Sequence, residues 1–130
     1  MKISFQVIMV SEFFIKGHVP SSKNSKVWTG KHLIHSKQTR EYIASTKMHY
    51  FLEGLEFKKA TKNLKKPLIL GFKFIRSTKH KFDYINMLQI VQDMMVKYHW
   101  IDDDNCDEVM PMFQPYEYNK DKPGVLISIL

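Results

Sequence analysis

The sequence predicts an α+β fold, a single domain over residues 1–130 in which a mixed β-sheet packs with two main helices. The first observation is length, because 130 residues are enough for one hydrophobic core and too few for two. The second is that residues 36–52 and 84–99 carry apolar side chains at helical spacing. The third is that short runs rich in β-branched and aromatic residues flank both segments.

The first strand is expected over residues 3–16, which are rich in Ile, Phe and Val, and Gly17 ends it. A polar, basic segment follows. Within it, Thr29-Gly30 separates Lys26-Val27-Trp28 from His32-Leu33-Ile34 and predicts the tip of a hairpin.

The first helix is expected to begin after an N-cap at Ser36, to run to about Leu52 and to end at Gly54. Its apolar face is predicted to consist of Tyr42, Ile43, Met48, Phe51 and Leu52. Residues 57–67 hold five lysines, which favours a solvated linker or a rim that faces phosphates.

Residues 68–75 predict a strand in the centre of the sheet. The second helix is expected from Tyr84 to about His99, and at about 100° per residue its apolar side chains fall on one broad face. Its polar residues Asn86, Gln89, Asp93 and Lys97 share a narrow arc beside that face. Irregular and terminal strands are predicted over residues 109–118 and 125–130.

The charges of the chain are segregated. Residues 1–82 hold seventeen Lys or Arg against four Asp or Glu, whereas residues 83–130 hold three against nine. With a net charge of +7 and a pI near 9.4, a polyanion such as nucleic acid is the expected partner.

A single cysteine, Cys106, excludes an internal disulfide and favours a reducing, cytoplasmic setting. No segment approaches the roughly 18 to 20 apolar residues of a membrane span.

Aspartates cluster around the second helix, at Asp83, Asp93 and Asp102 to Asp104. Asp83 is also a natural N-cap, and Asp93 is also suited to an i,i+4 pair with Lys97. Three carboxylates after a helix C-terminus oppose the helix dipole, so a positive charge is expected among them. A divalent cation supplies that charge, and Lys97 with His99 is the alternative. EF-hand and zinc-ligand spacings do not fit these residues.

Two stretches carry a resemblance to a known family. They are Pro20-Ser21-Ser22-Lys23-Asn24, and Asp83-Tyr84-Ile85-Asn86-Met87-Leu88-Gln89 with Asp93 and Asp103-Asp104 after it. In this order they resemble the RusA-type Holliday junction resolvases, phage-associated endonucleases with a Pro-Ser-x-Asn turn, an Asp-x-Asp-Asn-x-x-Lys-x-x-x-Asp helix and an Asp-Asp loop. The resemblance covers most of the chain, and only the helix and the acidic loop are distinctive.

The resemblance implies catalytic and metal-binding roles for Asp83 and Asp93, with Asp103 or Asp104 as the last ligand. Asn86 matches the family's asparagine. Two positions depart from the pattern, because Ile85 replaces an aspartate and Gln89 replaces the catalytic lysine. The residues predicted to replace that lysine are Lys97, as a catalytic group, and Lys81.

The expected activity is Mg²⁺-dependent hydrolysis of four-way DNA junctions in recombination and repair by a homodimer, with Mn²⁺ as the alternative ion. The residues expected to contact DNA are Lys23, Asn24, Lys26, Lys31, Lys81 and Asn86. Two alternatives remain open: a non-catalytic DNA-binding relative with a decayed site, and a nuclease that acts on flaps or single strands.

Overall fold

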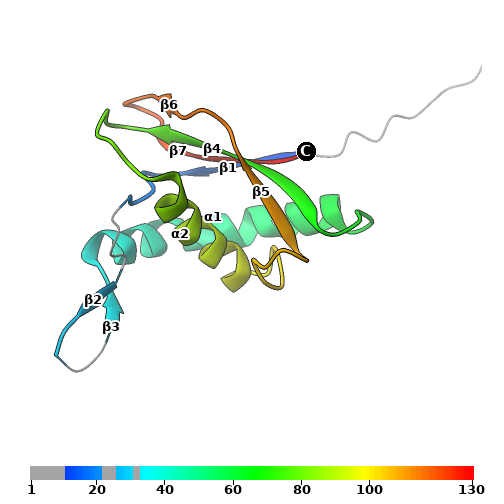
Figure 1. The fold of residues 1–130 in the computed structure, drawn as a ribbon, viewed down its shortest axis with the longest axis horizontal. Coiled ribbons are helices and arrows are strands. Elements are labelled where there is room, and N and C mark those ends of the chain that lie inside the picture. The colour runs from blue at the N-terminus through cyan, green and yellow to red at the C-terminus, as the bar shows by residue number, and fades with distance from the viewer. Residues whose placement is uncertain (1–10, 22–25, 31–32) are drawn as a thin grey trace, which may run out of the picture.

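The structure is a computed structural model that describes residues 11–21, 26–30 and 33–130, and the backbone alone at residues 26–28 and 33–34. Its main sheet has the order β1-β7-β4-β5, with β6 also paired to β4 (Figure 1). The elements are β1 (Glu12–Lys16), β2 (Lys26–Trp28), β3 (Leu33–His35), α1 (Lys37–Thr61), β4 (Leu68–Arg76), α2 (Tyr84–Lys97), β5 (Val109–Phe113), β6 (Glu117–Tyr118) and β7 (Gly124–Ile129).

The sheet is mixed, as predicted. β7 runs antiparallel to β1 and β4, whereas β5 and β6 run parallel to β4. Both helices lie on the same side of the sheet in Figure 1. Alternate residues of β4 are buried and pack under them, and these are Leu68, Leu70, Phe72, Phe74 and Arg76. The predicted α+β fold with two main helices is therefore confirmed.

The N-terminus of α1 forms as predicted. The Ser36 side chain accepts a hydrogen bond from the Thr39 backbone N–H at 3.3 Å, which is the expected capping contact. The predicted end at Gly54 is wrong, because the helix continues for seven residues to Thr61. Gly54 is instead the place where the Trp100 side chain reaches the helix, since a Cβ there would lie 2.6 Å from Trp100 Nε1.

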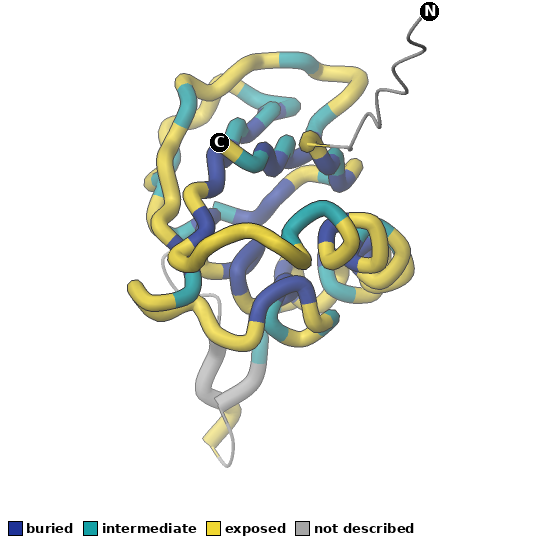
Figure 2. The backbone as a smooth tube through the Cα atoms, turned by 90° about the vertical axis from the view of Figure 1, so that its right-hand side faces the viewer, coloured by how far each residue is buried: buried dark blue, intermediate teal, exposed yellow. Residues whose placement is uncertain are grey.

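The buried side of α1 is narrower than predicted. Buried residues recur every three or four positions and are Thr39, Tyr42, Thr46, Tyr50, Gly54 and Phe57. Of the predicted apolar face, Tyr42 is buried and Ile43 is partly buried, but Met48, Phe51 and Leu52 are exposed. Figure 2, which views α1 close to end-on, shows exposed residues along its outer side. The helix therefore carries an apolar strip that the core does not cover.

α2 matches its prediction closely. Its buried residues include Met87, Leu88, Ile90, Val91, Met94 and Met95. The helix ends at Lys97, and His99 follows with a positive φ of 65°. Neither helix of the described residues has the length and apolar content needed to cross a membrane.

The remaining strand predictions are also confirmed in outline. β2 and β3 pair in an antiparallel hairpin whose loop contains Thr29 and Gly30. The first strand is described only from residue 11, and Gly17 ends it with a φ of 132°. Residues 109–118 form two short strands, β5 and β6, separated at Gln114 to Tyr116.

Candidate functional site

Asp83 lies at the start of α2, after the loop that leaves the carboxyl end of β4. Its backbone has the extended conformation of an N-cap, with φ −103° and ψ 124°. Its side chain makes no capping hydrogen bond, and the residue is exposed. Asp83 therefore occupies the N-cap position, as its alternative role predicts, but its side chain makes no capping hydrogen bond. The carboxylate is available to a ligand at the mouth of the loop.

Asn86 and Ile85 occupy the first turn of α2 beside Asp83. The Asn86 side-chain Nδ2 is buried and has no hydrogen-bond partner in the described part of the chain. Ile85, at the position where the family has an aspartate, is 71% exposed. Gln89 is exposed one turn further along. This part of α2 therefore keeps one carboxylate and the asparagine of the family pattern, but lacks the second carboxylate and the lysine.

Asp93 and Lys97 lie together further along α2. Both line a cavity of about 220 Å³, which His35 of β3 and Thr39 of α1 also line. Lys97 is exposed, and its Nζ lies 5.8 Å from the ring centroid of Tyr98. The predicted shared arc of these two residues is thus confirmed, and it faces the junction between the hairpin and α1.

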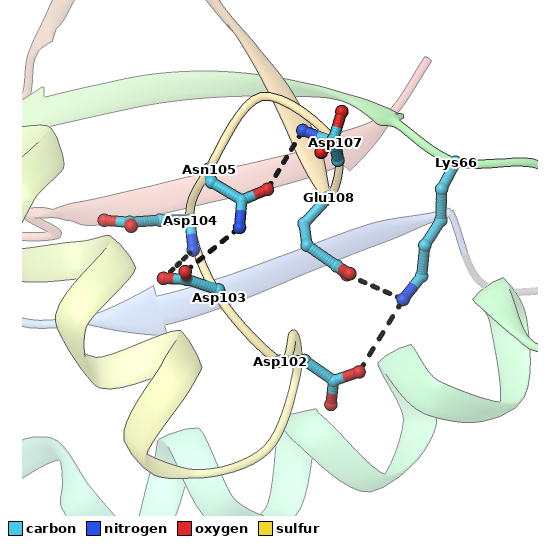
Figure 3. A network of polar contacts seen from close by, with 7 residues as sticks. All are labelled: Lys66, Asp102, Asp103, Asp104, Asn105, Asp107 and Glu108. Carbon is cyan, nitrogen blue, oxygen red and sulfur yellow. Dashed lines mark hydrogen bonds and ion pairs between the residues drawn. The ribbon is translucent and has the colours of Figure 1, made fainter.

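Lys66, two residues before β4, brings a positive charge to the acidic loop. Its Nζ lies 2.6 Å from Glu108 Oε2 and 3.8 Å from Asp102 Oδ2 (Figure 3). The hydrogen bond to Glu108 is the main cause of a raised pKa of the Lys66 ammonium. The sequence predicts a divalent cation as the positive charge of this loop, with Lys97 and His99 as the alternative. Lys66 is not predicted, because its contact with Glu108 joins residues 42 positions apart.

Asp103 stabilises the turn of the acidic loop. Its Oδ1 accepts a hydrogen bond from the Asp104 backbone N–H at 2.8 Å, and its Oδ2 accepts one from the Asn105 amide at 3.0 Å (Figure 3). The bond from Asp104 N–H, followed by the Asn105 amide, holds the pKa of the Asp103 carboxyl below its usual value. Asp104 is exposed. Of the two alternatives for the last ligand, Asp104 is therefore the carboxylate less engaged in holding the loop.

The predicted carboxylates do not meet within one chain. α2 has 14 residues, and a rise of 1.5 Å per residue separates its two ends by about 21 Å. Asp83 lies at one end, Asp104 follows the other, and Asp93 lies between them. No group of three or more His, Cys, Asp or Glu side chains suited to a metal ion occurs among the described residues. Among the described residues, the four predicted aspartates are therefore not gathered into one cluster of metal ligands.

Several predicted DNA contacts fall outside the part of the chain that the structure describes. These are Lys23, Asn24 and Lys31, and the side chain of Lys26 in β2. Lys81 is exposed and lines a cavity of about 580 Å³ together with His18, Arg76 and His80.

The other three basic residues of this cavity were not predicted from the sequence. A signal for one of them was present, because Arg76 continues the inward alternation of β4 from Leu68 to Phe74 with a charged residue. A charge in phase with a buried face indicates a special environment.

Comparison of the chain with models of known protein families and with curated protein sequences finds no match. The resemblance to the RusA-type resolvases therefore stays a prediction that rests on the residues quoted for it. The functional assignment depends on the geometry at the two ends of α2 and in the cavity that Lys81 lines.

Proposed function

We propose that this protein is a metal-dependent endodeoxyribonuclease that cleaves branched DNA, with four-way junctions as its substrate in recombination and repair. The observation that carries the proposal is the placement of Asp83. Its carboxylate caps no helix and projects from the loop that also bears His80 and Lys81, two basic residues of a cavity. An exposed carboxylate close in sequence to basic side chains suits a site where a metal ion and a phosphodiester meet.

The first turn of α2 suits Mg²⁺ if the protein supplies a single carboxylate ligand. In proteins this ion keeps several waters and takes one or two carboxylates together with phosphates of the substrate. Asp83 would hold it, with the side-chain oxygen of Asn86 as a neighbouring polar group, and Mn²⁺ suits the same oxygen ligands. When bound, such an ion lowers the pKa of a coordinated water and neutralises charge on the phosphate.

A homodimer is part of the proposal. Resolution of a four-way junction needs two matched cuts, and a two-fold dimer presents two equivalent sites. The exposed strip of α1, formed by Met48, Phe51, Leu52 and Leu55, supports self-association because these apolar residues share one side of the helix at i, i+3, i+4 and i+7. An antiparallel pairing centred between Phe51 and Leu52 also places Glu41 of one copy opposite Lys62 of the other.

A dimer also offers a way to join the separated carboxylates. Since Asp83 precedes α2 and Asp104 follows it, and no cluster of metal ligands joins them among the described residues, one ion could reach both if the second copy supplied one of them. Equal mixtures of Asp83→Asn and Asp104→Asn proteins test this arrangement. Recovery of cleavage in the mixture indicates a site shared between subunits. Absence of recovery, with each variant inactive alone, assigns both residues to sites within a subunit.

The main test measures cleavage of a labelled four-way junction with and without Mg²⁺. The wild type is expected to cut symmetrically only with the ion, and Asp83→Asn is expected to bind the junction while cleavage falls at least a hundredfold. Asp121→Asn is the matched control, because Asp121 is an exposed aspartate in the loop before β7. It should cut like the wild type. Junction binding without any cleavage by the wild type would contradict the enzyme assignment.

A non-catalytic DNA-binding protein is the second candidate. The exposed Ile85 favours it, since an apolar side chain stands where the family pattern has a metal ligand. Its signature is junction binding that Mg²⁺ does not convert to product. Equal cleavage of linear and four-way DNA would instead favour a nuclease of another substrate class.

For each of these candidate functions we propose a cytoplasmic protein, because its one cysteine, Cys106, is free and exposed.

A further inference from the structure

The cavity of about 580 Å³ beside the start of α2 has an unusual wall. Arg76, the last residue of β4, lines it although the side chain is only 2% exposed. Within the described residues no carboxylate forms an ion pair with this guanidinium. Its Nη1 donates to the Val19 carbonyl at 3.1 Å and contacts Met87 Sδ at 3.4 Å, while Nε is buried without a hydrogen-bond partner.

A buried guanidinium without a counter-charge is unfavourable, because the charge has left water and nothing of opposite sign replaces it. The face of Phe82, 4.7 Å from Arg76 Cζ, offers only partial compensation. Burial accordingly lowers the pKa of Arg76. An anion in the cavity supplies the missing charge and an acceptor for the free guanidinium donors.

The other walls of the cavity suit the same ligand. His18, His80 and Lys81 add three basic side chains, and His18 Nδ1 lies 2.8 Å from Ser77 Oγ. The turn residues Pro20 and Ser21 also line the cavity. One carboxylate is present, Glu41, and it lies on an exposed side of α1 with Lys37 Nζ 4.0 Å away. The net charge of the wall is positive.

We infer that this cavity binds a phosphate group, and that in the DNA complex the group belongs to the backbone of the bound strand next to the position of Asp83. The volume falls in the range of about 300–1,000 Å³ that small ligands occupy, so a phosphate enters with its sugar. Arginine suits the role because its planar fork binds two phosphate oxygens at once. The phosphate specificity follows from the cavity itself; its assignment to a DNA strand rests on the proposed function.

The first test uses inorganic phosphate as the probe and measures binding by calorimetry. The wild type should bind, Lys81→Gln should bind about tenfold more weakly, and Arg76→Gln should show no binding. Because Arg76 is buried, circular dichroism must confirm that its variant folds, and the exposed pair His80→Gln with Lys81→Gln gives the same comparison if it does not. Lys59→Gln is the matched control, since Lys59 is exposed near the other end of α1. Wild-type affinity in the His80 and Lys81 double variant overturns the inference.

The second test distinguishes a strand phosphate from a free one. Anisotropy of a labelled junction in EDTA should show about tenfold weaker binding by the double variant. The slope of the logarithm of its junction affinity against the logarithm of salt concentration should also fall by about one for each phosphate that the variant no longer neutralises. Phosphate binding with unchanged junction affinity would overturn the assignment to DNA. Weakened junction binding by the double variant, in a protein whose wild type never cleaves, supports the cavity while it contradicts the nuclease.

Discussion

Single residues in this protein combine a role in folding with a role in the candidate site. Arg76 anchors the Val19 carbonyl and lines the cavity, while Asp83 begins α2 without capping it. Asp83 was predicted from the family resemblance, whereas Arg76 was not predicted. The reason is physical, because the significance of Arg76 lies in its burial without a carboxylate, and burial depends on neighbours that a linear pattern does not name.

His18 should make folding sensitive to mild acid. Its pKa is lowered by burial and, to a smaller extent, by the charge of Arg76. A lowered pKa means that the unfolded chain takes up the proton first, so stability should fall as the pH drops from above 6.5 through the folded-state pKa. Thermal denaturation between about pH 7.5 and 5 should show this decline, and His18→Gln should reduce its slope.

A matched control makes the prediction for His18 specific. His49→Gln is the matched control, because His49 lies 3.8 Å from Glu53 on α1, away from the cavity. It should leave the acid-induced loss close to that of the wild type. An unchanged slope in the His18 variant would show that other groups govern the decline.

At the scale of elements, the sequence predicts α2 well. For α1 it predicts the start of the helix but not its end. The apolar face of α2 packs as its spacing predicts, and the helix ends at Lys97, two residues before the predicted end. α1 was predicted to stop at Gly54 because glycine commonly ends helices. Its continuation depends on the Trp100 side chain, whose Nε1 donates to the Tyr50 carbonyl at 2.7 Å. That contact joins residues 50 positions apart, beyond what local pattern can show.

Gly54→Ala tests this explanation of α1. In an isolated helix the change gains about 1 kcal/mol. Here the new Cβ would meet the Trp100 indole at 2.6 Å, and overpacking of this kind costs about 1–3 kcal/mol. We expect a net loss of up to about 2 kcal/mol in urea denaturation. In a Trp100→Leu background the same change should be neutral or stabilising. A more stable Gly54→Ala protein would contradict the packing role.

At the scale of the whole molecule, the predicted site residues lie before, within and after α2. The sequence places its aspartates within 22 residues, from Asp83 to Asp104, and that proximity suggested one metal centre. The helix between them, α2, is 14 residues long and therefore extends over about 21 Å. The loop at the far end is held by Lys66, so its carboxylates have a structural role as well. A site shared between two chains, or separate sites, agrees with the absence of a cluster of metal ligands among the described residues.

The apolar strip of α1 provides the corresponding test of assembly. Leu52→Glu introduces a charge at a residue that is 53% exposed, so the fold should persist while the dimer dissociates. Sedimentation velocity should report a dimer for the wild type and a monomer for this variant, with cleavage reduced at least tenfold. Leu64→Glu is the matched control, because Leu64 is similarly exposed but lies beyond α1. A dimeric Leu52→Glu protein would exclude the strip as the interface.

The position of β7 has a consequence for how the molecule forms. This strand comes last in the sequence, yet it lies between β1 and β4 and pairs with both. During synthesis, β4 can pair with β5 and β6 as they emerge, but no strand joins β1 to β4 until residues 124–129 have left the ribosome. Until then the core lacks β7, so part of the apolar surface of the earlier elements stays exposed. A nascent chain stalled before Gly124 should bind chaperones, whereas the completed chain buries that surface in one late, cooperative step.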